Sequence, residues 1–312
     1  MNVLAIGAGL VGCNFAREMK DRGHNVVLYD LSPNEAYIRN VAGDMPVVRA
    51  NMQDLSALIE TMQEHKIETV FQSAFLIGQP LNSRPYDGVR ANVNGSLAVI
   101  EAIRLTGARR LIFAGTFGVY DFNRNPQQPI KEDFPVIGGH LYLSSKLASE
   151  ELLGAFANWY QIEFATVRFA QIYGYGHYAA GDLAGPAMHE VLSDAMAGNQ
   201  VKIDPGVLSY NDYIYAKDVG HGVALACEKP LNHRLYHLGS GSLCSPDDVA
   251  DAIREVIPGA NIEVLKEPVV GPFWRHEQIL DLTRVRDELG YEPRYGLVAG
   301  LREFAKDLKN YG

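Results

Sequence analysis

A tyrosine and a lysine four residues apart, Tyr142 and Lys146, form a pair that can carry out proton transfer. Residues at i and i+4 lie on one face of a helix, so the phenol and the ammonium would be neighbours. An isolated tyrosine titrates near pH ~10 and is a poor base at neutral pH. A lysine one turn away favours the phenolate and lowers the pKa of the tyrosine toward the working range. The spacing also arises by chance in many helices, so the pair needs support from elsewhere in the chain.

A hydroxyl group earlier in the chain supplies that support. The run Leu111-Ile-Phe-Ala-Gly-Thr116 is typical of a buried strand, and it ends in Thr116 at the carboxyl edge of the expected sheet. Thr116 can hydrogen-bond the same substrate oxygen that Tyr142 deprotonates. The sequence therefore predicts three catalytic residues that act on a substrate hydroxyl: Thr116, Tyr142 and Lys146.

The first twelve residues have the order strand, glycine turn, helix. Val3–Ile6 is a short apolar run of the kind buried on both faces of a sheet, and Gly7, Gly9 and Gly12 follow it. At this spacing the first glycine permits a tight turn and the second lets the backbone approach a pyrophosphate. The third lets helix and strand pack closely. The helix expected over 10–21 offers free N–H groups and a positive dipole end to phosphates. This predicts a dinucleotide site.

A second apolar run, Asn25–Tyr29, ends at Asp30, about twenty residues after the turn. A carboxylate at this place can accept hydrogen bonds from both hydroxyls of an adenosine ribose. It would also repel the 2′-phosphate of NADP, and the residues that follow it, 31–33, include no arginine to neutralise one. The predicted cofactor is therefore NAD.

The bulk composition is that of a soluble globular protein. The 312 residues are 47% hydrophobic and 10% aromatic, with a mean hydropathy of -0.08. This length has room for one large domain or two intimate ones. No stretch approaches the ~18 apolar residues of a membrane span, and the chain enters its first strand without a signal peptide. The net charge of -9, with no basic cluster, argues against nucleic acid or an anionic membrane as a partner.

Metal chemistry is not expected. Cys13, Cys227 and Cys244 are odd in number and far apart, without paired metal spacing. This usage suits reduced thiols in a cytoplasmic protein. His233 and His237 fall on a strand-like run, where they would lie roughly 13 Å apart at ~3.3 Å per residue. Nitrogen ligands of zinc sit ~2 Å from the metal, so these two histidines cannot share one ion.

Strand-like and helical segments alternate through the first half of the chain. The expected strands are 3–6, 26–29, 47–49, 69–72, 110–114 and 164–169, and the expected helices lie near 10–21, 55–65, 86–106 and 141–159. This alternation predicts an α/β fold, a Rossmann-type doubly wound parallel sheet with helices on both faces. After residue 170, glycine-, proline- and tyrosine-rich stretches predict a smaller C-terminal lobe over the carboxyl edge of the sheet, where such sheets bind ligands. The predicted division is an NAD-binding domain over 1–170, to which about 207–240 return, and a mainly substrate-binding lobe over 171–312.

These residues resemble the extended short-chain dehydrogenase/reductase family, of the NAD-dependent epimerase/dehydratase type, which contains the sugar-nucleotide epimerases. The resemblance covers essentially the whole chain, including Gly7-Ala-Gly-Leu-Val-Gly12, Thr116-Phe-Gly-Val-Tyr120, Arg168-Phe-Ala-Gln-Ile-Tyr-Gly174 and Leu238-Gly-Ser-Gly241. It implies a mobile hydride on a nicotinamide, with Thr116 and Tyr142 polarising the reacting oxygen. It also implies cofactor contacts from Gly7, Gly9, Leu10, Val11, Gly12, Asp30, Asn51, Met52, Ala74, Asn92, Tyr142 and Lys146.

The substrate positions depart from the family pattern. Members that act on nucleotide sugars usually carry an asparagine at 171 and an arginine at 211, where this chain has Gln171 and Asn211. A further expected arginine falls on Gly271, although Arg275 or His276 could partly replace the missing cations. Arginine neutralises a diphosphate best, through bidentate hydrogen bonds. The departures therefore favour a small sugar, sugar acid or similar polar alcohol. The substrate contacts predicted from this comparison are Thr116, Phe117, Gln171, Asn211 and Arg275.

The predicted function is an NAD-dependent oxidoreductase that takes a hydride from a secondary alcohol of a small polar substrate, as a dehydrogenase or an epimerase. Two alternatives stay open: a UDP-sugar 4-epimerase, and a catalytically silent dinucleotide sensor on the same fold. The helices near 86–106 and 141–159 carry apolar residues on more than one side, and such helices need a second partner. Family members commonly pair these helices, so a homodimer is predicted.

Overall fold

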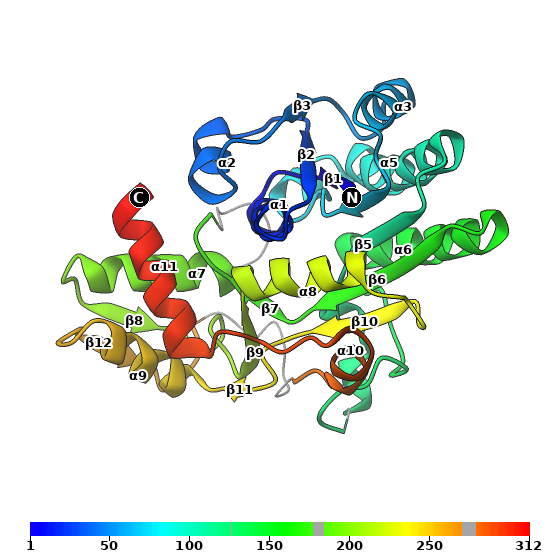
Figure 1. Cartoon of the computed structure of the whole chain (residues 1–312). Coiled ribbons are helices and arrows are strands. Elements are labelled where there is room, and N and C mark those ends of the chain that lie inside the picture. Colours follow the sequence, from blue (N-terminus) through cyan, green and yellow to red (C-terminus); the bar gives the residue numbers. More distant parts are fainter. Residues whose placement is uncertain (126, 177–183, 270–278) are drawn as a thin grey trace.

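The computed structural model describes residues 1–125, 127–176, 184–269 and 279–312. Its centre is a seven-stranded sheet in the order β10-β6-β5-β4-β1-β2-β3 (Figure 1), in which each neighbouring pair of strands runs parallel. The strands are β1 (Asn2–Ile6), β2 (Asn25–Asp30), β3 (Val47–Arg49), β4 (Thr69–Gln72), β5 (Arg110–Thr116), β6 (Glu163–Phe169) and β10 (Leu235–Leu238). The predicted Rossmann-type doubly wound sheet is confirmed.

Helices cover both faces of this sheet (Figure 1). One face carries α1 (Leu10–Asp21) and α8 (Ala216–Glu228), and the other carries α3 (Leu55–Glu64), α5 (Pro85–Thr106) and α6 (Leu141–Tyr160). Successive side chains of a strand point to opposite faces. In β1, Val3 and Ala5 therefore join the core under α1 and α8, while Leu4 and Ile6 join the core under the other three helices. This double burial explains why the run is apolar at every position.

Shorter elements connect these layers. The helices α2 (Glu35–Val41) and α4 (Gln79–Asn82) lie between strands of the large sheet in the chain order, and two 3-10 turns (Phe117–Val119 and Phe122–Arg124) follow β5. Near the C-terminal end of the sequence, α10 (Thr283–Leu289) packs against β10.

A smaller lobe is built from the second half of the chain. It contains a three-stranded sheet of β7 (Gln171–Tyr173), β9 (Asn211–Tyr215) and β11 (Leu243–Cys244), and a two-stranded sheet of β8 (Val201–Ile203) and β12 (Ile262–Val264). Its helices are α7 (Ala184–Met196), α9 (Pro246–Val256) and α11 (Leu297–Tyr311). Because β7 begins two residues after β6 ends, the lobe starts at the carboxyl edge of the large sheet. The chain returns to that sheet with α8 and β10, whereas β9 stays in the smaller sheet.

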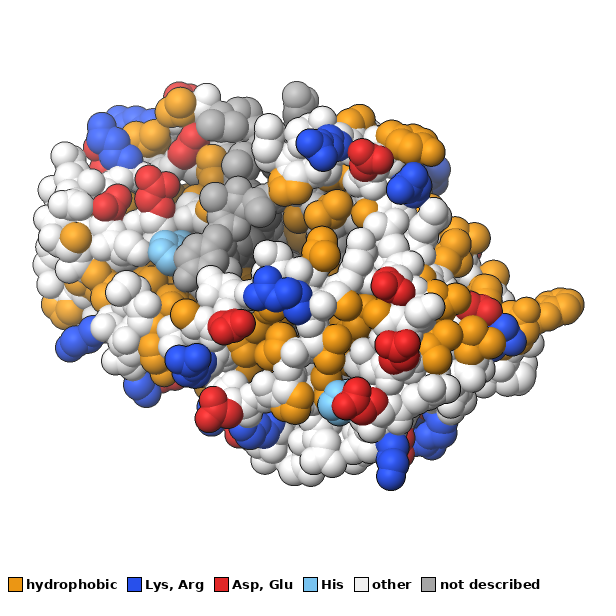
Figure 2. Space-filling model, turned by 90° about the horizontal axis from the view of Figure 1, so that it is seen from above, with side chains coloured by type: hydrophobic (Ala, Val, Ile, Leu, Met, Phe, Trp, Pro, Cys, Tyr) orange, Lys and Arg blue, Asp and Glu red, His pale blue; other side chains and the backbone are white. Residues whose placement is uncertain are grey.

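Large exposed apolar side chains are concentrated on α5 and α6. On these two helices the most exposed are Tyr86 (75%) and Trp159 (81%), and the other exposed ones are Leu105, Leu141, Leu152 and Tyr160. In Figure 2 hydrophobic side chains gather toward the right-hand end of the molecule, where α3, α5 and α6 lie in Figure 1. The two helices also pack on each other, so their outer sides form one continuous surface.

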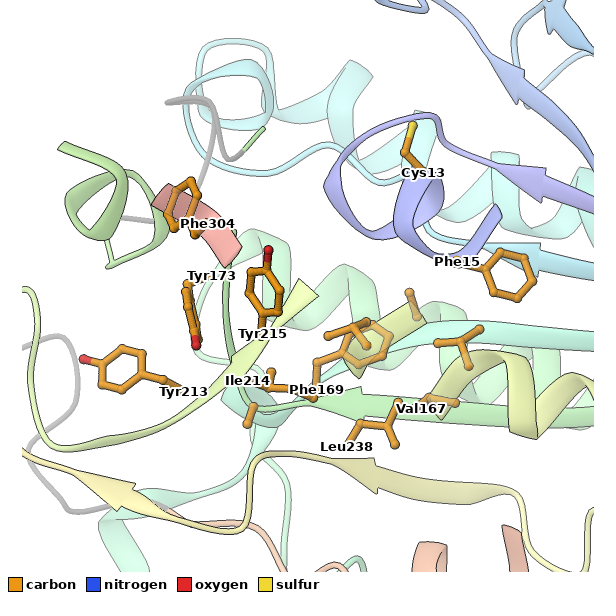
Figure 3. Close-up of a cluster of buried hydrophobic side chains, with 14 of the residues drawn as sticks. Cys13, Phe15, Val167, Phe169, Tyr173, Tyr213, Ile214, Tyr215, Leu238 and Phe304 are labelled. Atoms are coloured by element: carbon orange, nitrogen blue, oxygen red, sulfur yellow. The ribbon is translucent and has the colours of Figure 1, made fainter. Parts of the chain in front are cut away.

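Aromatic side chains pack within each of the two lobes and belong to one buried cluster. Tyr173 of β7 and Tyr215 of β9 lie with their ring centroids 5.4 Å apart, and Figure 3 shows Phe304 of α11 above them. On the side of the large sheet, Phe15 of α1 packs on Phe71 of β4 at 4.6 Å between ring centroids. One buried cluster therefore runs from the large sheet into the smaller lobe.

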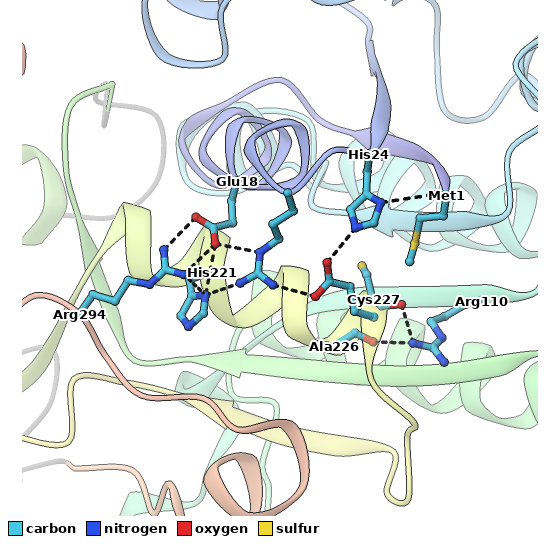
Figure 4. Close-up of polar contacts among 10 residues, drawn as sticks. Met1, Glu18, His24, Arg110, His221, Ala226, Cys227 and Arg294 are labelled. Carbon is cyan, nitrogen blue, oxygen red and sulfur yellow. Dashed lines mark hydrogen bonds and ion pairs between the residues drawn. The ribbon is translucent and has the colours of Figure 1, made fainter.

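A polar cluster fastens α1 to α8 (Figure 4). Glu18 of α1 pairs with Arg294 at 3.0 Å, and Arg22 of α1 pairs with Glu228 of α8 at 2.7 Å. Burial acts to raise the pKa of Glu18, but hydrogen bonds from His221 and the two arginines hold that pKa at about 2. The helix whose N-terminus follows the glycine turn is thus held in place by charge as well as by its apolar face.

Candidate active site

The predicted catalytic residues meet where β5 ends and α6 begins. Tyr142 and Lys146 lie in the first two turns of α6, which packs against β5 and against the 3-10 turn after Thr116. Lys146 Nζ donates a hydrogen bond to the Ala114 carbonyl oxygen at 2.7 Å, two residues before Thr116 in β5. Thr116 Oγ1 accepts a hydrogen bond from Gly118 N at 3.2 Å, which leaves the hydroxyl hydrogen of Thr116 for a substrate oxygen.

The side chain of Lys146 is buried, and burial strongly perturbs its pKa. Its side chain is 4% exposed, and its Nζ lies 3.8 Å from the ring centroid of Phe75 and 4.7 Å from that of Phe113. Burial lowers the pKa of Lys146 to about 7, against an opposing effect of Glu150. The ring centroid of Tyr142 lies 5.9 Å from Nζ, where a charged Lys146 favours the phenolate. Because the pKa of Lys146 is about 7, only part of the molecules carry this charge at neutral pH.

A buried ion pair lies one turn beyond Lys146, and the sequence reasoning did not identify it. Glu150 Oε1 accepts a hydrogen bond from Arg168 Nη2 of β6 at 2.6 Å, and the two side chains are 15% and 4% exposed. Burial raises the pKa of Glu150, with Arg168 opposing it. The guanidinium of Arg168 also lies over the ring of Tyr120 at 4.8 Å. The position of Glu150, four residues after Lys146, was the available signal.

The glycine turn has the shape of a phosphate cradle. Gly9 is the N-cap of α1 and makes no side-chain cap, and a Cβ added there would meet nothing within 4 Å. A Cβ on Gly12 would lie 1.7 Å from the Gly7 carbonyl oxygen, so helix and strand touch at this point. Leu10 and Val11 follow in the first turn, both half-buried. The open space at Gly9 and the N–H groups of this turn fit a pyrophosphate.

Asp30 lies beside that turn at the carboxyl end of β2. Its Oδ2 accepts a hydrogen bond from Ala8 N at 2.8 Å and its Oδ1 accepts one from Ser32 N at 2.7 Å. These bonds orient the carboxylate and leave lone pairs for two ribose hydroxyls. The geometry fits the ribose-binding role predicted for Asp30.

The two residues predicted at the adenine lie next to each other after β3. Asn51 is exposed, and its Oδ1 accepts a hydrogen bond from Gln53 N at 3.0 Å. Met52 packs against α5, where a Cβ on Gly95 would lie 2.7 Å from its Cε. Both are positioned on the same side of the sheet as α5, and their contact with adenine stays a prediction.

The segment after β4, which contains Ala74, is held in place by backbone hydrogen bonds and by the side chain of Asn92. Ala74 N donates to the Ile6 carbonyl oxygen at 2.8 Å, which joins this segment to β1. The buried Asn92 accepts a hydrogen bond from Leu76 N at 2.7 Å and donates one to the Leu76 carbonyl oxygen at 2.9 Å. Its amide therefore fixes the backbone at Leu76, and the predicted contact of Asn92 with the dinucleotide stays a prediction.

The residues predicted to contact substrate are only partly brought together. Gln171 of β7 and Asn211 of β9 lie on neighbouring strands, 7% and 2% exposed, and the Oδ1 of Asn211 accepts a hydrogen bond from Asp212 N. Phe117 is 6% exposed, and its ring packs on Phe122 at 6.2 Å, which leaves little of it for a ligand. Arg275 lies outside the described residues, as do Gly271 and His276.

Within the described ranges, no group of three or more His, Cys, Asp or Glu side chains is arranged to hold a metal ion. No helix in the described part of the chain has the length and apolar character needed to cross a membrane.

A doubly wound sheet with a phosphate cradle, a ribose acid and a tyrosine–lysine pair at one edge is the arrangement of a dinucleotide-dependent oxidoreductase. The model of the NAD dependent epimerase/dehydratase family matches residues 3–239, and the chain belongs to this family. It is therefore an NAD-dependent enzyme. The resemblance and the cofactor predicted from the sequence are both confirmed.

Individual proteins of known structure or function are similar along their whole length. The chain is 27% identical over 318 residues to the UDP-glucose 4-epimerase of Mycolicibacterium smegmatis, and the match covers 99% of each. The UDP-glucose 4-epimerase of Thermus thermophilus, solved in complex with NAD, superposes with a TM-score of 0.83 at 22% identity, with 100% of each chain covered. A partial-consensus L-threonine 3-dehydrogenase superposes with a TM-score of 0.85 at 20% identity, covering 99% of this chain and 100% of that one. Solved structures at this identity share the fold, and they do not choose the substrate.

Proposed function

We propose that the protein oxidises a secondary alcohol on a small sugar, sugar acid or similar polar substrate that carries no diphosphate. The observation that carries this proposal is the absence of lysine and arginine from four elements of the smaller lobe, whereas its β8, α9 and α11 do contain such residues. In its described part, α7, β7, β9 and β11 contain no lysine or arginine. Two phosphates in a buried pocket need cationic partners. Gln171 and Asn211 instead offer amide groups, which match the donors and acceptors of hydroxyl groups.

The chemistry follows from the residues at the end of β5 and the start of α6. NAD, when bound, supplies the acceptor for a hydride. Tyr142 takes the proton of the substrate hydroxyl, while Thr116 donates a hydrogen bond to the same oxygen. The substrate carbon gives up its hydrogen to NAD together with the electron pair of the C–H bond, and the C–O bond becomes a carbonyl. Lys146 in its ammonium form favours the phenolate of Tyr142 and binds ribose hydroxyls.

A UDP-sugar 4-epimerase is the second candidate. It is favoured by the names of full-length relatives such as the Mycolicibacterium smegmatis protein. In that reaction the same three residues act, and the hydride returns to the opposite face of the sugar carbon. The diphosphate would then need cations from outside the four elements named above.

Ligand binding and turnover distinguish the two candidates. The enzyme is titrated calorimetrically with UDP and UDP-hexoses, and NADH formation is followed on a panel of sugars, sugar acids and other polar alcohols. We expect NADH formation with at least one small alcohol and no tight binding of UDP. Low-micromolar binding of UDP, or 4-epimerisation of UDP-glucose at ordinary enzymatic rates, would instead support the epimerase.

We also propose that the protein is a cytoplasmic homodimer that pairs through α5 and α6. The exposed apolar side chains on these helices support a second partner, and the three free cysteines fit a reducing compartment. Light scattering should give twice the 34.4 kDa monomer mass. Trp159→Glu should produce the monomer, while Val269→Glu, at a similarly exposed apolar residue outside these helices, should not. A monomer for the unaltered protein at micromolar concentration would reject the dimer.

A further inference from the structure

The ring of Phe75 packs directly against the ammonium group of Lys146. Phe75 lies three residues after the end of β4, and its ring centroid is 3.8 Å from Lys146 Nζ. An ammonium has three N–H donors. One of them goes to the Ala114 carbonyl oxygen at 2.7 Å, and the faces of Phe75 and Phe113 cover the nitrogen from other sides. We call the ring of Phe75 in this position the Phe75 cover.

The backbone that carries the cover is fixed, so the movable part is the side chain. Ala74 N is bound to the Ile6 carbonyl oxygen on one side of Phe75. On the other side, both backbone polar groups of Leu76 are bound to Asn92. The ring itself is only half-buried, and it meets Tyr142 edge-on at 6.0 Å between centroids. Rotation of the ring away from Lys146 therefore needs no change in the strand.

We propose that Phe75 and NAD compete for the ammonium of Lys146, with the Phe75 cover leaving when ribose hydroxyls take its place. The inference rests on the proposed role of Lys146 as a ribose ligand. Its consequence is that NAD binds at the expense of a cation–π contact and is exchanged between turnovers, as a dehydrogenase requires. An enzyme that keeps NAD through many cycles would gain nothing from such a cover.

The cover also links NAD binding to proton uptake. Burial lowers the pKa of Lys146 to about 7, with Glu150 opposing it. Among the described residues, the charged and titratable groups with a stated interaction at this nitrogen are Glu150 and Tyr142 of α6, and Glu150 is itself paired with Arg168 of β6. Hydrogen bonds from the ammonium to ribose oxygens favour the charged form and raise its pKa. Above pH 7, NAD therefore binds together with a proton.

The size of the effect follows from the fraction of ammonium. At pH 8 a lysine with a pKa of about 7 is charged on about one molecule in ten. If NAD requires the charged form, its apparent affinity is lowered about tenfold at this pH. Phe75→Ala opens the nitrogen to water, so the pKa of Lys146 returns toward its ordinary range. We expect the variant to bind NAD about tenfold more tightly at pH 8.

Calorimetric titration of the apoprotein with NAD at pH 8, in phosphate and in Tris, measures both quantities. The two buffers differ in ionisation enthalpy, so the difference in binding heat gives the protons taken up. The wild type should take up most of one proton, and Phe75→Ala should take up little. Phe75→Leu keeps an apolar cover but removes the π face, so at pH 6, where the ammonium predominates, it should bind NAD a few-fold more tightly than the wild type does. This variant carries the test if Phe75→Ala does not fold, and equal affinities at pH 6 would then overturn the proposal.

A second pair of variants isolates the contact with Lys146. In the Lys146→Met background, Phe75→Ala should no longer change NAD affinity, since no ammonium remains to be covered. An unchanged gain in that background would overturn the proposal, as would NAD binding by the wild type without proton uptake. Those results would leave the proposed function standing. No NAD binding by the wild type at all would overturn both.

Discussion

Replacing the buried lysine is the sharpest test of the electrostatics of this site. Lys146→Met keeps an unbranched side chain of similar length and removes the charge. In the folded apoprotein the ammonium lies between two aromatic rings, and burial lowers its pKa from 10.5 to about 7. In the unfolded chain the same group is fully hydrated. The substitution should therefore stabilise the apoprotein at neutral pH, while it removes a predicted catalytic residue.

The magnitude can be worked out from the shift. One unit of pKa corresponds to about 1.4 kcal/mol, so the shift of Lys146 corresponds to about 5 kcal/mol in favour of the uncharged form. Loss of the hydrogen bond to the Ala114 carbonyl oxygen costs about 1 kcal/mol. At pH 7 the variant should gain about 4 kcal/mol in free energy of unfolding.

The difference in stability between the wild type and Lys146→Met should also depend on pH. Between about pH 7 and 10.5 the unfolded chain holds a proton on Lys146 that the folded protein has lost. Where the unfolded state binds more protons, stability rises with pH. The wild type should therefore gain up to about 1.4 kcal/mol per pH unit relative to Lys146→Met. The advantage of the variant should fall by about 2 kcal/mol between pH 7 and pH 9.

Urea unfolding of the two apoproteins, followed by far-ultraviolet circular dichroism at pH 7, 8 and 9, measures this difference. Lys309→Met, at an exposed lysine near the end of α11, is the control and should show no difference that changes with pH. A Lys146→Met protein that is less stable than the wild type at pH 7 would refute the reasoning. So would an advantage that stays constant from pH 7 to 9.

Three further results are expected. Tyr142→Phe should fold and bind NAD but lose about 10²-fold or more of turnover, because only the proton-transferring oxygen is removed; near-normal rates would contradict the assignment. NAD(H) should bind more tightly than NADP(H) in calorimetric titrations, and Asp30→Ser should narrow the difference because the carboxylate that repels a 2′-phosphate is gone; tighter NADP(H) binding by the wild type would reject the role of Asp30. Gly12→Ala should lower stability by about 3 kcal/mol or more, because its Cβ would lie 1.7 Å from the Gly7 carbonyl oxygen. Gly9→Ala, with nothing within 4 Å, should melt like the wild type and bind NAD more weakly; equal melting temperatures for the two glycine variants would count against this account.

The cofactor half of the molecule could be predicted from local patterns. The run Val3–Ile6, the glycines that follow it and the position of Asp30 depend on interactions within short stretches of chain. A tight turn needs glycine whatever surrounds it, and an i, i+4 pair faces one way on any helix. The expected strands and helices of residues 1–170 accordingly coincide with β1 to β6 and with the long helices between them.

The tertiary structure decided the state of the groups that those patterns located. Nothing near Lys146 in the sequence shows that Phe75 covers it, because Phe75 comes from the segment after β4 and Lys146 from α6, and they meet only when both pack on β5. The same holds for the Glu150–Arg168 pair and for Asn92, whose amide is used by the backbone of Leu76. Burial and the resulting pKa depend on distant segments that remove water from a side chain, whereas spacing along the chain records only which side chain is there.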